Sequence, residues 1–195
     1  MNKIILFLED RPGRQEQYLT TEDINNIQTI EGVEILLGDK CREMIEQLNN
    51  NDDSSLNEFT LLLIHRSALS QSGIHTVISH CKNKNKNLVF FSGGISQSLF
   101  SYENFPYLML NSKDFYQHNL ITFLRNYVDG KTKDITELIY GDKCEINLML
   151  TYRQFLLKGE LGRAEENFKK SLEKLIGKLT LEELNKEIKS KITLI

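Results

Sequence analysis

Five short apolar segments alternate with helical patterns over the first 130 residues, and this alternation constrains the fold more than any other feature. The segments are KIILFL (3–8), VEILLG (33–38), FTLLLI (59–64), NLVFFSGG (87–94) and FPYLMLNSK (105–113). Most read as continuous apolar runs, as expected of strands buried on both faces. Strands that alternate with helices require crossover connections and a parallel sheet covered on both sides. We therefore predict an α/β fold with a doubly wound five-stranded parallel sheet of order 2-1-3-4-5.

Helical patterns fill the intervals between these segments. A polar helix is predicted over 12–19, because proline is tolerated in a first helical turn. A clearer amphipathic helix follows over 39–50, and a weaker one over 72–86. The segment 114–130 predicts a helix with a continuous apolar side made of Leu120, Phe123, Leu124 and Tyr127.

The composition changes after residue 130, so we divide the chain into a sheet domain (1–130), a polar connector (131–144) and an all-α C-terminal extension (145–195). Thr180 and Glu183 form a capping box within the extension. Its apolar stripe consists of Leu161, Phe168, Leu172, Leu175, Leu181, Leu184 and Ile188. The stripe can pack within the chain, pair with a second copy, or dock on another protein. We expect it to be buried outside the core of the sheet domain, and residues 1–144 to fold without it.

Charge and cysteine content argue against several classes of protein. The formal charge is −3 with no long basic block, so neither nucleic-acid nor membrane-surface binding is predicted. Cys41, Cys81 and Cys144 lack CxxC spacing and leave one cysteine unpaired under any pairing, which favours a reduced, cytoplasmic protein. The apolar run near the N-terminus is too short for a signal peptide, and no stretch reaches the roughly 18 apolar residues of a membrane span.

Polar side chains that could form a site cluster where the predicted strands end. They are Glu9, Asp10, His65, Ser92 and Lys113. In a sheet of this order, the carboxyl ends of four of the five strands lie on one side of the point where the strand order reverses. We therefore expect these five side chains to converge on one crevice.

In this pattern the sequence resembles a response-regulator receiver domain, over residues 3 to about 129. The resemblance implies an acidic pair that holds Mg²⁺, here Glu9 and Asp10. It also implies a hydroxyl, Ser92, and a lysine, Lys113, that bind a phosphoryl group. The aspartate that accepts phosphate in that family is replaced by His65, so the resemblance is to a degenerate receiver, a pseudo-receiver. Imidazole is a poor substitute for an oxygen ligand of Mg²⁺.

His65 therefore occupies an acceptor position without a carboxylate to phosphorylate. One hypothesis is that an imidazolium beside Glu9 and Asp10 replaces the positive charge of the missing metal. Another is a pH-sensitive site, because a histidine near carboxylates can titrate near neutrality. For Lys113, we expect an ion pair with Asp10, because a partly buried lysine needs a counter-charge.

Other chemistries match the sequence less well. Asp10, His65 and Ser92 include the residue types of a hydrolytic triad, but FFSGG lacks the glycine that precedes the serine of a nucleophile elbow by two residues. The SGG turn could form a nest of backbone N–H groups for a phosphate. His75 and His80 lack the further ligands that a zinc site needs, so surface or packing roles are predicted for them.

We therefore predict a non-enzymatic regulatory or adaptor protein that acts through protein–protein contacts, with a protein partner or a second copy bound by the C-terminal helices. No catalytic, cofactor-binding or metal-binding residue is assigned, and Glu9, Asp10, His65, Ser92 and Lys113 are expected to form a vestigial receiver pocket. The alternative is a sensor that binds a small molecule or a phosphate ligand in that pocket. The resemblance implies signalling, and inactive receivers of this kind occur in bacterial regulatory and phage-defence systems.

Overall fold

The structure is a computed structural model that describes residues 4–95, 99–100, 107–117, 119–132, 134–141 and 144–193. Its strands are β1 (Ile5–Glu9), β2 (Val33–Leu37), β3 (Leu61–His65), β4 (Asn87–Ser92), β5 (Leu99–Phe100) and β6 (Leu108–Asn111). Its α-helices are α1 (Gln15–Tyr18), α2 (Thr21–Gln28), α3 (Gly38–Asn49), α4 (Gln71–Lys84), α5 (Ser112–Gln117), α6 (Leu120–Val128), α7 (Glu137–Tyr140), α8 (Cys144–Lys158), α9 (Arg163–Ile176) and α10 (Leu181–Thr193). Three 3-10 turns cover Pro12–Arg14, Ser54–Glu58 and Arg66–Ala68.

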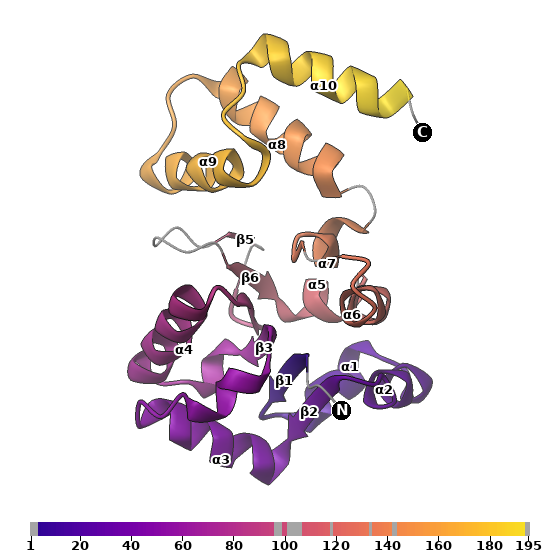
Figure 1. The fold of residues 1–195 in the computed structure, drawn as a ribbon, viewed down its shortest axis with the longest axis vertical. Helices are drawn as coiled ribbons and strands as arrows, with labels where there is room; N and C mark the ends of the chain where they lie inside the picture. Colours follow the sequence, from indigo (N-terminus) through magenta and orange to yellow (C-terminus); the bar gives the residue numbers. More distant parts are fainter. Residues whose placement is uncertain are drawn as a thin grey trace.

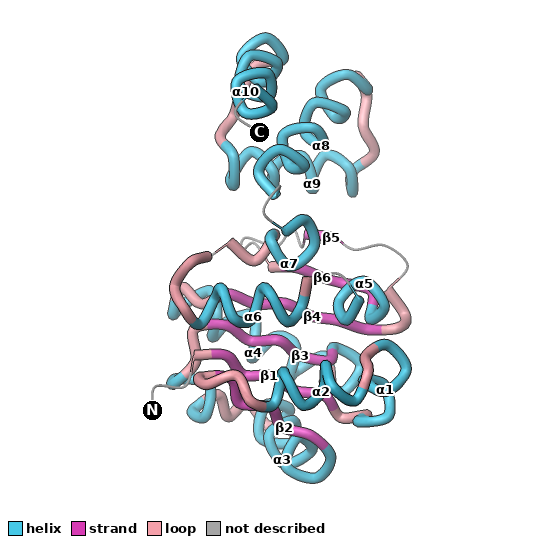
Figure 2. Tube along the Cα trace, turned by 90° about the vertical axis from the view of Figure 1, so that its right-hand side faces the viewer, coloured by secondary structure: helices cyan, strands magenta, loops and turns pink. Residues whose placement is uncertain are grey.

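Five strands form a parallel sheet in the order β2-β1-β3-β4-β6, which confirms the predicted order 2-1-3-4-5 (Figures 1 and 2). The two-residue strand β5 extends the sheet by pairing antiparallel to β6. The carboxyl ends of β1, β3, β4 and β6 thus lie along one edge of the sheet. This topology is consistent with the flavodoxin-like fold.

The two faces of the sheet alternate residue by residue, so each strand contributes to two separate hydrophobic clusters. Phe7, Leu63 and Phe91 belong to the cluster under α2, α5 and α6. Leu8 and Ile64 belong to the cluster under α3 and α4. Because both faces are covered, all five residues of β1 and of β3 are buried, which explains the continuous apolar runs in the sequence.

Two helices begin at positions that were not predicted from the sequence. After the short helix α1, the chain starts a further helix, α2, with Thr20 as its N-cap and Asp23 completing a capping box. The predicted fifth strand ends two residues early, because β6 stops at Asn111 and α5 begins at Ser112. Residues 105 and 106 of that predicted strand lie outside the described residues.

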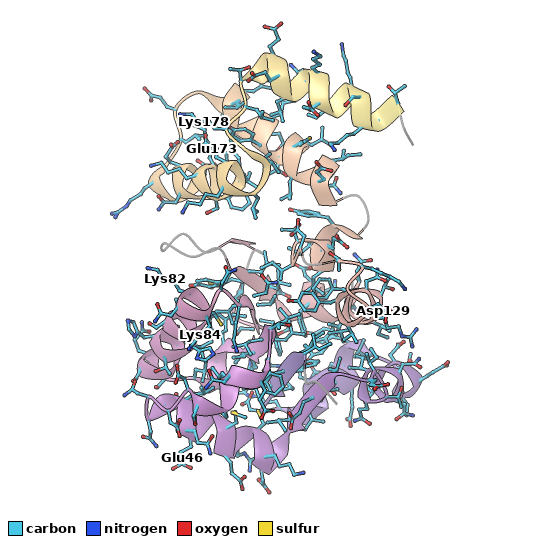
Figure 3. All side chains as sticks on the ribbon, viewed as in Figure 1. Glu46, Lys82, Lys84, Asp129, Glu173 and Lys178 are labelled. Atoms are coloured by element: carbon cyan, nitrogen blue, oxygen red, sulfur yellow. The ribbon has the colours of Figure 1, made fainter. Side chains whose placement is uncertain are left out.

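The C-terminal extension is helical, as predicted, and α8 packs against both α9 and α10 beyond the β5 end of the sheet (Figure 1). The hydroxyl of Tyr152 on α8 donates to Glu173 on α9 at 3.0 Å and to the carbonyl of Leu179 at 3.3 Å. Glu173 is labelled on α9 in Figure 3. No helix among the described residues is long and apolar enough to cross a lipid bilayer.

The buried apolar residues of the extension are linked to the hydrophobic cluster of the sheet domain. Tyr152, Leu172, Leu184 and Ile188 belong to the same contiguous cluster as the sheet face under α6. The predicted connector contributes to this continuity, because it contains α7 with Leu138 fully buried in that cluster. The expectation that the stripe is buried outside the sheet core and the division at residue 145 both stay predictions. Helix α8 packs mainly on α9 and α10, while α7 and β5 link the extension to the sheet domain.

Candidate functional site

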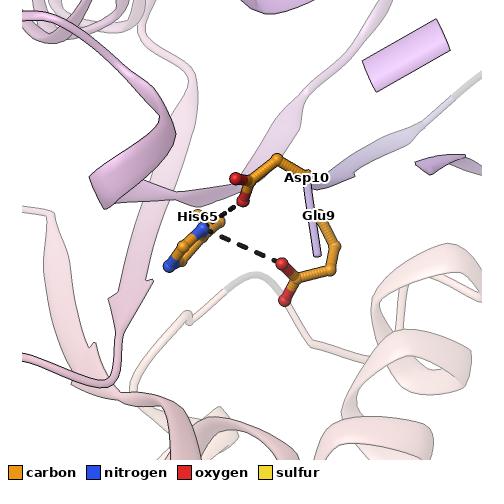
Figure 4. Close-up of side chains that lie close together, drawn as sticks. All are labelled: Glu9, Asp10 and His65. Atoms are coloured by element: carbon orange, nitrogen blue, oxygen red, sulfur yellow. Dashed lines mark hydrogen bonds and ion pairs between the residues drawn. The ribbon is translucent and has the colours of Figure 1, made fainter. Parts of the chain in front are cut away.

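Glu9, Asp10 and His65 meet at the carboxyl ends of the neighbouring strands β1 and β3, and both carboxylates point toward the imidazole (Figure 4). The side chain of Glu9 is 0% exposed, that of His65 is 1% exposed, and that of Asp10 is 20% exposed. His65 Nδ1 forms a hydrogen bond with Asp10 Oδ1 and lies 3.8 Å from Glu9 Oε1. Parallel pairing of β1 with β3 explains the meeting, because it aligns the last residues of both strands.

Arg14, in the turn that follows β1, forms a hydrogen bond with the other nitrogen of the imidazole. Its Nη1 atom contacts His65 Nε2, and a guanidinium can only donate, so Nε2 must accept. These partners place the ring proton on Nδ1, which donates to Asp10, and the imidazole is therefore neutral. Burial is the largest cause of a lowered His65 pKa; Arg14 lowers it further, while Asp10 and Glu9 raise it. The hypothesis of an imidazolium that balances the carboxylates is thus not supported, and Arg14 supplies a positive charge next to the ring instead.

The carboxylate of Glu9 is held by donors from two other elements. Its Oε2 atom accepts a hydrogen bond from the Tyr116 hydroxyl on α5 at 2.7 Å, and its Oε1 atom accepts from the backbone N–H of Arg11 at 2.9 Å. Burial and the neighbouring Glu9 raise the Tyr116 pKa, so the hydroxyl remains a proton donor. A buried carboxylate needs such donors, because leaving it unpaired would be costly.

The cluster does not fit the Mg²⁺ ion that the receiver resemblance implies. One oxygen from each carboxylate and one nitrogen of His65 lie within 4.8 Å of one another, but Mg²⁺ prefers about six oxygen ligands in octahedral geometry. Both oxygens of Glu9 and both nitrogens of His65 already have hydrogen-bond partners. The Arg14 guanidinium on the same ring also brings a positive charge to the place where a cation would bind.

Ser92 and Lys113, the other two predicted site residues, do not join this cluster. The Ser92 hydroxyl bonds to the hydroxyl of Ser67 at 2.7 Å and accepts a weaker bond from the backbone N–H of Gly94 at 3.3 Å. Lys113 has an exposed side chain, and its backbone N–H donates to Asn111 Oδ1 at 2.8 Å. Among the residues that the structure describes, Lys113 forms no ion pair with Asp10, which instead lies 3.7 Å from Arg11 Nε. The predicted pairing of Lys113 with Asp10 is therefore wrong.

The other candidate residues that the structure describes, which are the serine of the possible triad, the remaining histidines and two of the cysteines, have contacts that do not form a catalytic or metal site. Within the described part of the chain, Ser92 forms no hydrogen bond with His65, which a hydrolytic triad of Asp10, His65 and Ser92 would require. His75 is exposed, whereas His80 is buried and bonds to Asp53 at 2.7 Å, which matches the predicted surface and packing roles. Cys41 and Cys81 are free and buried, and burial raises the pKa of each thiol to about 12.

Arg14 and Tyr116, which bond to His65 and Glu9, were not predicted from the sequence. The arginines of the EDRPGR segment were a usable signal for Arg14, because they directly follow the acidic pair. Comparison with known proteins finds no matching family model, no similar curated protein and no similar solved structure.

Proposed function

We propose that this chain is a non-enzymatic regulatory or adaptor protein with a degenerate receiver unit, and that it acts through protein contacts made by its helical extension. The observation that carries the proposal is His65 at the position where a receiver has its phosphoacceptor. The imidazole is buried and bonded at both nitrogens, to Asp10 and to Arg14. The protein's own donors also hold the acidic partner Glu9.

The surface of the extension supports a role in binding another protein. Among the described residues, the exposed large apolar side chains are Leu150, Leu157, Leu175 and Ile192, and all four lie on α8, α9 or α10. Single exposed leucines are common on protein surfaces, but here the exposed large apolar side chains are all on the helices of the extension. A protein partner or a second copy of the chain would cover these side chains.

The first test is phosphorylation. Incubation with acetyl phosphate and Mg²⁺, followed by intact-mass measurement, should give no phosphoryl adduct on the full chain. The variant His65→Asp, which restores a carboxylate at the acceptor position, is the companion sample, and an adduct on this variant would support the receiver assignment. An adduct on the unmodified protein would contradict the proposal.

The second test is association. Light scattering coupled to size exclusion, together with quantitative capture from the native host, should detect a complex of the full chain. The double variant Leu157→Gln/Ile192→Gln should weaken that complex, because it removes two exposed apolar side chains without disturbing the buried ones. Lys186→Gln, an exposed position on α10, is the matched control and should leave the complex intact. Equal association of all three proteins would argue against binding through the extension.

The alternative prediction, a sensor pocket over Glu9, Asp10, His65, Ser92 and Lys113, receives less support from the contacts. The first three side chains bond to one another or to neighbouring residues, Ser92 bonds to Ser67, and Lys113 is exposed. A ligand in that place would have to displace several buried hydrogen bonds.

A further inference from the structure

A separate cavity of about 410 Å³ opens beside the Glu9–Asp10–His65 cluster. Arg11 and Arg14 line it from the turn after β1, Gly93 from the turn after β4, and Ser112 from the first position of α5. None of the five residues of the predicted receiver pocket lines it. The cavity therefore shares Arg14 with the site described above, but its other polar groups are different.

Ser112 is the most informative of these residues. Its side chain is 1% exposed, and its hydroxyl has no hydrogen-bond partner among the residues that the structure describes. Buried hydroxyl groups in folded proteins nearly always have a partner, because an unpaired one costs free energy. This hydroxyl lines the same cavity as Arg11 and Arg14, so it is available to bond to an atom of a ligand there.

The two guanidinium groups give the cavity its chemical character. Arg14 forms no ion pair within the described ranges, and the neutral His65 ring takes up one of its five N–H donors. Arg11 is 67% exposed, and its Nε atom lies 3.7 Å from Asp10 Oδ2, which is too long for a strong bond. Both side chains thus keep donors available, and the planar fork of arginine matches the oxygens of a phosphate group.

The backbone at Gly93 leaves room for a ligand. A Cβ atom built at this glycine would have no neighbour within 4 Å, so the turn presents its main chain to open space. Tyr18 lines the same cavity and is partly exposed, with its ring stacked on Tyr116 at a centroid distance of 5.8 Å. A group attached to a bound phosphate could contact this ring.

We propose that this cavity binds the phosphate group of a small molecule, with Arg11 and Arg14 donating to its oxygens and the Ser112 hydroxyl completing the site. The ligand class is inorganic phosphate or a phosphate monoester whose organic part extends toward Tyr18. The inference does not depend on the adaptor role, because binding at this cavity is measured on the isolated full chain without any partner.

Calorimetric titration of the full chain with inorganic phosphate, at constant ionic strength, tests the proposal. Saturable binding is expected, and the variants Arg11→Gln and Ser112→Ala should each weaken it, the arginine change by roughly 10- to 100-fold. Arg42→Gln is the matched control: Arg42 is 70% exposed and sits beside Asp39, as Arg11 sits beside Asp10, but it does not line the cavity. Phosphate binding should be unchanged in this control.

A second measurement separates the role of Ser112 in the ligand site from a role in folding. Without phosphate, Ser112→Ala should melt at the same temperature as the unmodified protein or higher, because the lost hydroxyl had no partner. Repeating the titration with a nucleoside monophosphate distinguishes the ligand sources: equal affinity indicates recognition of the phosphate group alone, and tighter binding indicates an ester.

Three outcomes would overturn the proposal. They are the absence of saturable binding for both probes, equal binding by Arg11→Gln and the unmodified protein, and a lowered melting temperature of Ser112→Ala without phosphate.

Discussion

Replacing Tyr116 by phenylalanine tests how much the buried Glu9 carboxylate depends on its hydrogen bonds. The Tyr116 hydroxyl donates to Glu9 Oε2 at 2.7 Å, with Glu9 at 0% and Tyr116 at 2% exposure. Phenylalanine keeps the ring and its contacts with Phe7, Phe91 and Phe115, so the change removes little besides the donor. A hydrogen bond to a charged group contributes about 1.5–3 kcal/mol to the free energy of unfolding, and we expect a loss of that size.

Urea unfolding measures this loss, with a lowered midpoint and an unchanged slope. For a chain of this size, the melting temperature should fall by about 3 to 12 °C. The matched control is Tyr18→Phe: Tyr18 stacks on Tyr116, and its hydroxyl has no hydrogen-bond partner in the part of the chain that the structure describes. Its free energy of unfolding should stay within about 0.5 kcal/mol of the unmodified value.

A double-mutant cycle of Tyr116→Phe with Glu9→Gln then isolates the pair. The coupling energy should lie between about 0.5 and 3 kcal/mol, as for other residues in direct contact. If the free energy of unfolding of Tyr116→Phe lies within about 0.5 kcal/mol of that of the unmodified protein, the hydroxyl does not stabilise a buried carboxylate. That result would refute the description of Glu9 as held by this hydrogen bond.

The other predictions concern His65, the aromatic core and the extension. The folded state lowers the His65 pKa below its usual 6.5, so the unfolded chain binds a proton more readily than the folded chain. The free energy of unfolding should therefore decrease as the pH falls below about 6.5. Melting curves between pH 5 and 8 should show this decrease, and the variant His65→Gln should lack it. Phe115→Ala should cost about 3–5 kcal/mol in urea unfolding, because this fully buried ring stacks on Phe91 at 4.1 Å, and a loss below about 1 kcal/mol would contradict the packing described. The fragment 1–144 should still unfold cooperatively but at a lower temperature than the full chain, because the extension continues the cluster on the sheet; calorimetry without a cooperative transition would show that the chain has a single core.

The fold could be predicted from the sequence because strands that are buried on both faces have continuous apolar sequences. Leu61 to Ile64 form an uninterrupted apolar run, and the strand β3 lies there with every residue buried. The helix α2 was missed because its sequence is mostly polar, although Thr20 and Asp23 already carried the spacing of a capping box. The pattern of apolar residues alone therefore does not predict mostly polar helices that cover only part of a sheet face.

The candidate site could be predicted in part, because strand ends are fixed by topology whereas side-chain directions are not. Glu9, Asp10 and His65 meet because parallel pairing aligns the ends of β1 and β3. Lys113 does not join them because the chain turns into α5 at Ser112, which buries the serine and leaves the lysine exposed. Tyr116, on that same helix, could not have been found without knowing where α5 begins.

The short antiparallel strand β5 has a consequence for how this protein can associate. A parallel sheet normally has two open edges, and each presents a row of unpaired backbone N–H and C=O groups that can take up a strand from another chain. Here β5 pairs with β6, and α9 contacts β5 from outside. The opposite edge is β2, whose residues are all partly exposed. A partner strand that paired with β2 would extend the sheet on the side away from the helical extension (Figure 2).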